Sequence, residues 1–336
     1  MVYNILGCIC AVFCVERIDF MAKKTSIGGQ ALLEGIMMRG PQKTAMAVRH
    51  TSGEIIMEEF ETKGKDRKGI TTWPFVRGLF NMYDSLSFGY KCLMRSAELS
   101  GIDEEEKKKE EEKRRKKGKK AEPKLDKIFE KVLMPLATVL AVALALLLFV
   151  WLPMQLWKWI VPAGSAAADS YFLRACFEGV LRIIIFIGYV WATSLMKDIR
   201  RTYMYHGAEH KTIFCYEAGL PLTVENVRKQ SRLHPRCGTS FMILVLIVGI
   251  VVGMFIRIDF MPLRMLVKLA TFPIVVGCGY ELIKLAGRRD NAFTRAISAP
   301  GKALQRITTR EPDDGMIECA IAAMEKVIPE DGSDTW

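Results

Sequence analysis

The sequence has 336 residues, of which half are hydrophobic and a quarter are charged, and 48 Lys and Arg against 37 Asp and Glu give a formal net charge of +11. The mean hydropathy is positive, at +0.15. This combination excludes a disordered chain and argues against a simple soluble enzyme, because the charges must be segregated from apolar stretches. Nine cysteines without a repeated spacing give no disulfide framework and indicate a reducing compartment.

The first twenty residues do not resemble a functional segment. Their apolar run of about 14 residues is shorter than the roughly 20 that cross a bilayer, and they lack the basic start and cleavage site of a signal peptide. Met21 opens MAKKTSIGGQ, which is typical of an ordinary protein start. We therefore expect residues 1–20 to be a spurious N-terminal extension, with a short membrane-dipping anchor as the alternative.

Residues 21–100 predict a small α+β region on the cytoplasmic side. Two β-compatible runs, KTAMAVRH and EIIMEEFE, flank a turn at residues 51–53, which predicts a hairpin over residues 43–61. Apolar side chains in residues 73–97 recur at three- and four-residue steps, which predicts a helix. Such a stripe is most often part of a core, but an interfacial helix is a competing interpretation because membrane spans follow.

Residues 101–131 form a charged linker in which acidic residues come first and basic residues follow. A basic block directly before a membrane helix is attracted to anionic headgroups by about 1 kcal/mol per basic residue near the surface. Nucleic-acid binding is the alternative, but no aromatic residues interleave the charges of residues 103–124. We expect a lipid bilayer with anionic headgroups as the partner and no sequence-specific nucleic-acid binding.

Residues 132–286 predict four transmembrane helices. The apolar segments assigned to them are 132–157, 179–196, 238–256 and 269–286. The first is uncharged and is followed by tryptophans, as in an interfacial belt. Arg182 lies close enough to one end of the second span to snorkel, and the last span is the weakest because Glu281 and Lys284 interrupt it.

Lys and Arg residues in the connections predict the orientation. They are dense before the first span and in residues 197–236, and sparse at 158–178 and 257–268. The predicted fold is therefore an α-helical polytopic membrane protein, with four transmembrane helices and a small α+β cytoplasmic N-terminal region. Both termini, the 197–237 loop and a C-terminal tail at 287–336 are expected on the cytoplasmic side.

The first chemical motif is HGAEHK, at residues 206–211. If it is helical, His206 and His210 lie one turn apart on one face, which is the spacing for two imidazoles that share a metal ion. The order H-x-x-E-H also occurs in inverzincin peptidases, where the glutamate is the general base. Gly207 weakens the helix, and nothing else in the chain resembles those enzymes, so we do not infer peptidase activity.

The second motif is HPRCGTS, at residues 234–240. His234 and Cys237 are both good zinc ligands at a familiar spacing. With His206 and His210 they complete a tetrahedral set, and Glu209 is left as a base or a supporting partner. Imidazole and thiolate suit a divalent metal such as zinc better than magnesium or calcium. The alternatives are a purely polar cluster, or Cys215 as a ligand.

The number of ligands decides between a structural and a catalytic metal. Four protein ligands make a closed site, whereas three leave a position for water. In the open case Glu209 would activate the water, and Arg236 or Lys211 would stabilise an anionic intermediate. The sequence leaves both cases open.

Three segments together resemble the YqhQ-type bacterial membrane proteins, a family of unknown function described as metal-dependent enzymes. The segments are GGQALLEGIMMRGP at 28–41, HGAEHKTIFCYE at 206–217 and HPRCGTSF at 234–241. The resemblance covers about residues 25–310, nearly the whole chain. It implies an integral protein of the bacterial cytoplasmic membrane with a metal site and no settled reaction.

The first of these segments places Glu34 and Arg39 on an otherwise apolar, glycine-rich stretch. Charged groups are costly to bury without partners, so one interpretation is an internal ion pair that holds a tight loop. The other is that Glu34 reaches the metal loop and takes part in catalysis. Glu281 is a similar acid, for which Lys284 one turn away is the expected partner.

Two classes of function follow from these patterns. One is a membrane-embedded, metal-dependent hydrolase of unknown substrate with its site on the cytoplasmic side. The other is a non-catalytic membrane factor whose metal braces the fold, while the basic linker recruits a ribosome, a translocon or another membrane protein.

Overall fold

A four-stranded antiparallel sheet forms one end of the molecule in the computed structural model, which describes residues 24–62, 68–102, 104–105, 134–288 and 291–335. The strands are β1 (Gly28–Leu32), β2 (Gly35–Arg39), β3 (Lys43–Arg49) and β4 (Ile55–Glu61), and each pairs with the next in chain order. The expected N-terminal extension and most of the charged linker lie outside the described residues.

The hairpin predicted over residues 43–61 is confirmed. Strands β3 and β4 pair from Lys43 with Glu61 to Arg49 with Ile55, and Gly53 supplies the positive φ of 90° that the turn requires. The hairpin of β1 and β2 was not predicted, because its glycine-rich sequence carries little β-propensity. Its tight turn holds Glu34 at a φ of 49°.

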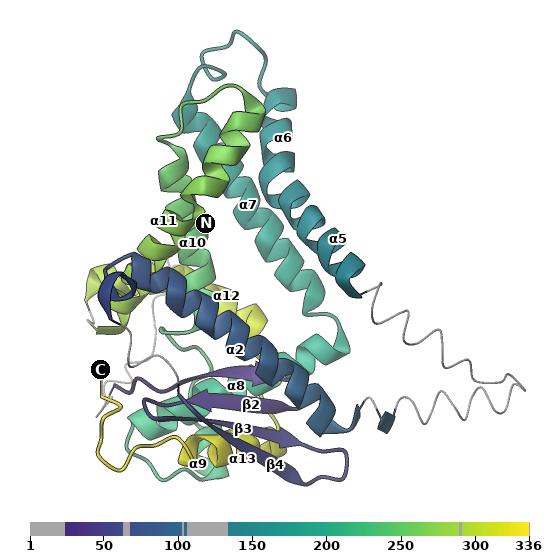
Figure 1. The fold of residues 1–336 in the computed structure, drawn as a ribbon, viewed down its shortest axis with the longest axis vertical. Helices are drawn as coiled ribbons and strands as arrows, with labels where there is room; N and C mark the ends of the chain where they lie inside the picture. The colour runs from purple at the N-terminus through teal and green to yellow at the C-terminus, as the bar shows by residue number, and fades with distance from the viewer. Residues whose placement is uncertain (1–23, 63–67, 103, 106–133, 289–290, 336) are drawn as a thin grey trace, which may run out of the picture.

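Side chains alternate across the sheet and create two cores. One face packs on helices α8 (Lys197–Glu217) and α13 (Asp314–Glu325), and the other packs on α2 (Val76–Ser100) (Figure 1). The short helix α9 (Val224–Arg228) packs on α8 and α13. The first face presents Ile36, Met38, Ala45 and Ala47, and the second presents Leu32, Met37, Met46 and Val48. We call strands β1–β4 with the helices α2, α8, α9 and α13 the sheet domain. Helix α2 confirms the helix predicted over residues 73–97.

The segments expected to be a loop and a tail are folded: α8 and α13 belong to this domain, and α12 (Ala292–Thr308) packs on the apolar helices α10 (Gly238–Gly253) and α11 (Met261–Arg288). Residues 197–217 form α8, a 21-residue helix with a largely buried C-terminal half. Residues 287–336 contain α12 (Ala292–Thr308) and α13, not a tail. The reason is an apolar stripe on α13, including Met316, Ile317 and Met324, which is buried against α8 and the sheet.

Apolar helices form the other end of the molecule (Figure 1). Three segments are long and apolar enough to cross a membrane: 135–160, 171–193 and 261–288. They comprise the continuous α5 (Met134–Leu146), η3 (Leu147–Trp151) and α6 (Leu152–Ile160), then α7 (Tyr171–Thr193) and α11 (Met261–Arg288). The expected third span is a shorter apolar helix of 16 residues, α10 (Gly238–Gly253).

Helix α2 joins the sheet domain to α11. The guanidinium of Arg77 donates to both oxygens of Glu281, with Nε 2.7 Å from Oε1, and the amide of Phe75 donates to the same carboxylate at 3.3 Å. Glu281 therefore pairs with Arg77 across two helices and not with Lys284 on its own helix, as the sequence suggested. This contact fixes the sheet domain against the apolar helices.

Candidate metal centre

Helix α8 places His206 and His210 on one face, one turn apart, with their ring centroids 4.4 Å from each other. Between them Gly207 meets the chain that follows α12, where a Cβ would lie 2.0 Å from the carbonyl oxygen of Arg310. The amide of Arg310 also donates to the carbonyl of Tyr203 at 2.8 Å. Glycine is therefore required here despite its low helix propensity, because another segment crosses the helix in contact with its backbone.

Both imidazoles are oriented by backbone carbonyls. Nδ1 of His206 lies 2.9 Å from the carbonyl oxygen of Thr308, and Nδ1 of His210 lies 2.6 Å from that of Arg232. A carbonyl can only accept, so each Nδ1 carries a proton, and Nε2 is the ring atom left for a metal ion once it is unprotonated. This is the arrangement of metal-binding histidines, whose other ring nitrogen donates to a carbonyl or carboxylate.

Cys237 supplies the third ligand atom. Its Sγ lies 3.1 Å from Nε2 of His206, and the ligand atoms of His206, His210 and Cys237 all lie within 4.8 Å of one another. The residue is the N-cap of α10 and accepts a hydrogen bond from the amide of Thr239. We call His206, His210 and Cys237 the ligand triad.

The triad holds Cys237 in the charge state that binds a cation, and balances it with a proton on His206. Burial opposes ionisation of Cys237, but the two histidines hold its pKa well below the usual range, so the thiolate is the stable form. Burial also opposes the charge of His206, and the adjacent thiolate overrides it and raises the pKa of His206 to about 9. Without a metal ion, a proton on His206 therefore balances the negative charge of the Cys237 thiolate. A bound metal ion would replace that proton and balance the thiolate instead.

Glu209 lies beside the triad and has one oxygen unpaired. Its carboxylate accepts a hydrogen bond from the backbone of Gly29, and burial raises its pKa despite the nearby histidines. A Cβ on Gly29 would lie 3.0 Å from this side chain, so the glycine admits the carboxylate against β1. Oε2 of Glu209 and Nε2 of His210 are buried without a hydrogen-bond partner among the described residues. A cation at the triad would meet the free Nε2 of His210, and the imidazole and thiolate donors fit a divalent metal of the zinc type.

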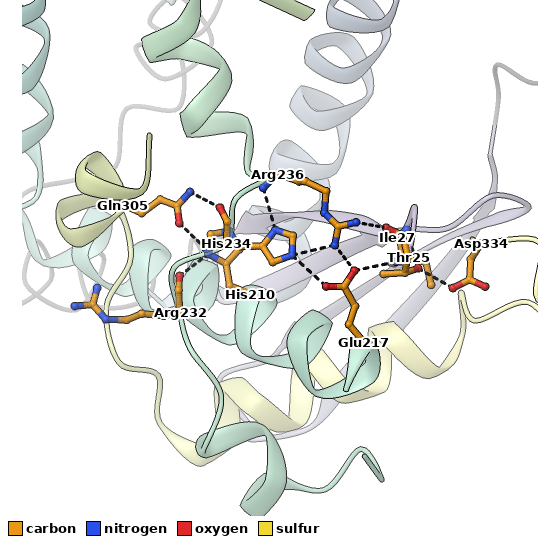
Figure 2. A network of polar contacts seen from close by, with 9 residues as sticks. All are labelled: Thr25, Ile27, His210, Glu217, Arg232, His234, Arg236, Gln305 and Asp334. Atoms are coloured by element: carbon orange, nitrogen blue, oxygen red, sulfur yellow. Dashed lines mark hydrogen bonds and ion pairs between the residues drawn. The ribbon is translucent and has the colours of Figure 1, made fainter. Parts of the chain in front are cut away.

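His234 lies next to His210, and its ring contacts Glu217 and Arg236 (Figure 2). Its ring centroid is 5.6 Å from that of His210, and its Nε2 is 3.6 Å from Oε2 of Glu217. Burial, with His210 and Arg236 nearby, lowers the pKa of His234 to about 4 even though Glu217 opposes the shift. The side-chain amide of Gln305 holds its backbone with two hydrogen bonds of 2.7 Å. The structure therefore separates His234 from the ligands with which the sequence grouped it.

Arg236 closes an ion cluster behind the triad. Its Nη2 contacts Glu217 and its Nη1 donates to the carbonyl of Thr25 at 3.0 Å, while Glu217 also accepts from the amide of Thr25 at 2.8 Å. The hydroxyl of Thr25 donates to Asp334 at 2.7 Å. We call Thr25, Glu217, Arg236 and Asp334 the clasp (Figure 2). It joins the two ends of the described chain to the 234–237 segment and holds Cys237 in place.

Glu34 reaches α8 but not the triad. Its carboxylate accepts from Nε of Arg201 at 2.5 Å and from the hydroxyl of Tyr205 at 3.4 Å. The ion pair expected with Arg39 is thus formed with Arg201. Lys211 likewise pairs with Glu311 at 2.8 Å, and the thiol of Cys215 donates to the carbonyl of Pro221, so neither joins the triad.

Sequence reasoning missed the residues that orient the ligands. Glu217 lies in the segment HGAEHKTIFCYE, but no role was predicted for it. A charged residue at the end of a buried helix needs a partner, so its position is a usable signal of an ion pair. The carbonyls of Thr308 and Arg232 and the amide of Gln305 carry no such signal. Their roles arise from the crossing of distant segments, which residue types do not reveal.

Comparisons with known proteins agree with the three-segment resemblance. A family model described as "Protein of unknown function (DUF1385)" matches residues 73–330. The chain is 33% identical over 303 residues to the "Uncharacterized protein YqhQ" of Bacillus subtilis (strain 168), covering 90% of this chain and 92% of the relative. No solved structure shows significant similarity. The chain belongs to the DUF1385 family, whose function is unknown.

Proposed function

We propose that the protein is a membrane-embedded metal-dependent hydrolase that binds one zinc-type divalent ion with His206, His210 and Cys237. The observation that carries the proposal is the orientation of both imidazoles, whose Nδ1 atoms donate to backbone carbonyls while their Nε2 atoms converge on Cys237. Three protein ligands leave a position for water, as in catalytic zinc sites.

The bound ion would supply Lewis acidity and a water of lowered pKa. Glu209 is the group that takes a proton, because it is buried beside the triad and its Oε2 has no hydrogen-bond partner in the described part of the chain. Its raised pKa moves it toward the range of an effective general base. Arg236, Glu34 and His234 position the site, since each is engaged with residues outside the triad.

A structural metal is the second candidate, and the burial of the site favours it. His210 is 1% exposed and Cys237 is 8% exposed. An ion at the triad would join α8 to the start of α10. In this case the protein is a non-catalytic factor, and its proposed partner is a ribosome, a translocon or another membrane protein. Anionic headgroups are the proposed partner of the charged linker.

Glu209→Gln separates the two candidates. In a hydrolase, the variant keeps about one metal equivalent per chain and loses the cellular function measured by complementation, because only proton transfer is removed. Glu61→Gln, at the exposed end of strand β4, is the control. A Glu209→Gln variant that retains both metal and function supports the structural role and contradicts the hydrolase.

We also propose how the chain sits in the membrane. Helix α10 would be a fourth span, although it is shorter than the other three. The density of Lys and Arg before the first span and in residues 197–236 supports a sheet domain and both termini on the cytoplasmic side of the bacterial inner membrane.

A further inference from the structure

A second group of charged side chains lies within the apolar helices, at the end remote from the sheet domain. Helices α7 and α11 both begin at that end (Figure 1). Glu178 and Lys268 are each the eighth residue of their helix, which places them about 10 Å inside its start at 1.5 Å per residue. They are therefore separate from the ligand triad, which lies in the sheet domain.

One buried carboxylate faces three cations in this group. Glu178, whose side chain is 1% exposed, contacts Lys268 and lies 3.2 Å from Nη2 of Arg182. Nη2 of Arg264 is 3.9 Å from the other carboxylate oxygen, too far for a hydrogen bond. We call Glu178, Arg182, Arg264 and Lys268 the inner charge cluster.

Among the described residues, the further charges that act on Arg264 do not neutralise this excess of positive charge. They are Arg174 and Asp259, which pair with each other at 3.1 Å and so contribute no net charge. Charges inside membrane helices are costly and are retained where they have a partner or a function. Basic residues are also disfavoured on the side of a membrane opposite the cytoplasm. An uncompensated basic cluster at this end therefore indicates a missing anion.

Unused hydrogen-bond donors point to the same conclusion. Arg264 is 2% exposed, yet its Nε and Nη2 have no hydrogen-bond partner within the described ranges. Arg182 is held in place by donating from Nε to the carbonyl of Phe149 at 2.7 Å. That carbonyl belongs to the π-helical turn η3, a kind of irregularity that is frequent at functional sites.

We propose that Arg182, Arg264 and Lys268 form a binding site for a phosphate-type anion within the apolar helices. Two guanidinium groups and an ammonium suit phosphate, because the guanidinium fork donates to two oxygens at once. Glu178 holds the cations together and competes with the anion for them. The anion is either the headgroup phosphate of a lipid or a free phosphate that enters from the remote end. This site is independent of the proposed metal chemistry.

The test measures anion binding to the purified full-length protein by thermal unfolding. Inorganic phosphate is compared with chloride at equal ionic strength in detergent, and nanodiscs of phosphatidylglycerol are compared with nanodiscs of phosphatidylcholine. Stabilisation by inorganic phosphate supports a free anion, and stabilisation by phosphatidylglycerol alone supports a lipid headgroup. The absence of both effects in the wild-type protein overturns the proposal.

Variants of the cluster separate an anion site from a simple ion-pair network. Arg264→Gln should weaken binding of the effective anion by roughly tenfold or more, because it removes a charged donor. Glu178→Gln should strengthen binding, because it removes the competing carboxylate. Arg257→Gln, an exposed arginine at the same end, should leave binding unchanged.

If the inner charge cluster is only an ion-pair network with no ligand, Glu178→Gln is not expected to strengthen the response to the anion. If Glu178→Gln weakens the response to the anion as much as Arg264→Gln, or if Arg264→Gln leaves it unchanged, the cluster only pairs its own members and the proposal fails. Should Arg264→Gln not fold, Lys268→Gln takes its place with the same expected loss.

Discussion

Single atoms in the backbone decide the chemistry of the ligand triad. The imidazoles of His206 and His210 are equivalent in sequence terms, but each is fixed by a carbonyl from a different segment, Thr308 in one case and Arg232 in the other. His234 has no such carbonyl on its ring and meets Glu217 instead. Residue type therefore selects candidates for metal binding, and backbone geometry selects the ligands among them.

Substitution of the histidines should distinguish ligands from neighbours. We expect His210→Ala to lose the metal measured by elemental analysis of the purified protein, because two ligands seldom retain zinc. His234→Gln should keep most of it, since the ring of His234 contacts Glu217 and is not part of the triad. His50→Ala, at an exposed turn, is the control. Full metal retention in His210→Ala would show that the triad is only a polar cluster.

Acid should release the metal, because protons compete for the same atoms. Binding requires neutral imidazole at Nε2 and thiolate at Cys237, so lowering the pH favours the metal-free form. Dialysis over a pH series followed by metal analysis checks this, with a chelator at neutral pH as the reference. A metal content that does not change on acidification would contradict a histidine-bound ion.

Gly207, the glycine of α8, should be far less replaceable than Gly188 of α7. We expect Gly207→Ala to lower the free energy of unfolding by about 2 kcal/mol or more, because the added Cβ would overlap the carbonyl of Arg310. Gly188→Ala meets nothing within 4 Å and should be neutral or slightly stabilising. Chemical denaturation in detergent measures both. Equal stabilities would mean that residues 308–312 do not cross the helix there.

At the scale of elements, helix α13 carries much of the core of the sheet domain. Ile317 is fully buried against α8 and the sheet. Truncation of a buried isoleucine to alanine costs about 2–5 kcal/mol, so Ile317→Ala should shift the unfolding transition of the sheet domain. Lys326→Ala, which only breaks an exposed ion pair with Glu59, should change stability by less than about 1 kcal/mol. An equal effect of the two would exclude a core role for α13.

Elements with a regular apolar period were predicted well from the sequence. The hairpin at 43–61 and the helix beginning at Val76 follow periods of two and 3.6 residues. The hairpin of β1 and β2 and the helices α12 and α13 were missed, since glycine-rich strands and short amphipathic helices acquire their stability from packing. Helix α7 begins at Tyr171, earlier than predicted, because Glu178 inside it is paired with Lys268 of another helix.

On the scale of the whole molecule, the sheet domain and the remote connections should lie on opposite sides of a membrane. The connection at 161–170 lies at the far end of the apolar helices (Figure 1), and Ala166 within it is exposed. We expect a cysteine at Ala166 to react with an impermeant thiol reagent in intact cells. A cysteine at Ser52, in the exposed β3–β4 turn, should react only after permeabilisation. The reverse labelling would invert the proposed orientation.

The discontinuity of the sheet domain has a consequence for biosynthesis. Its parts come from residues 24–102, 197–237 and 308–335, and the apolar helices are encoded between them. A ribosome that has just completed α11 has delivered both imidazoles and the carbonyl of Arg232, but not that of Thr308 or the side chain of Asp334. The sheet domain and the ligand triad therefore close only after these apolar helices have been made, so uptake of the proposed metal would report that their synthesis is finished.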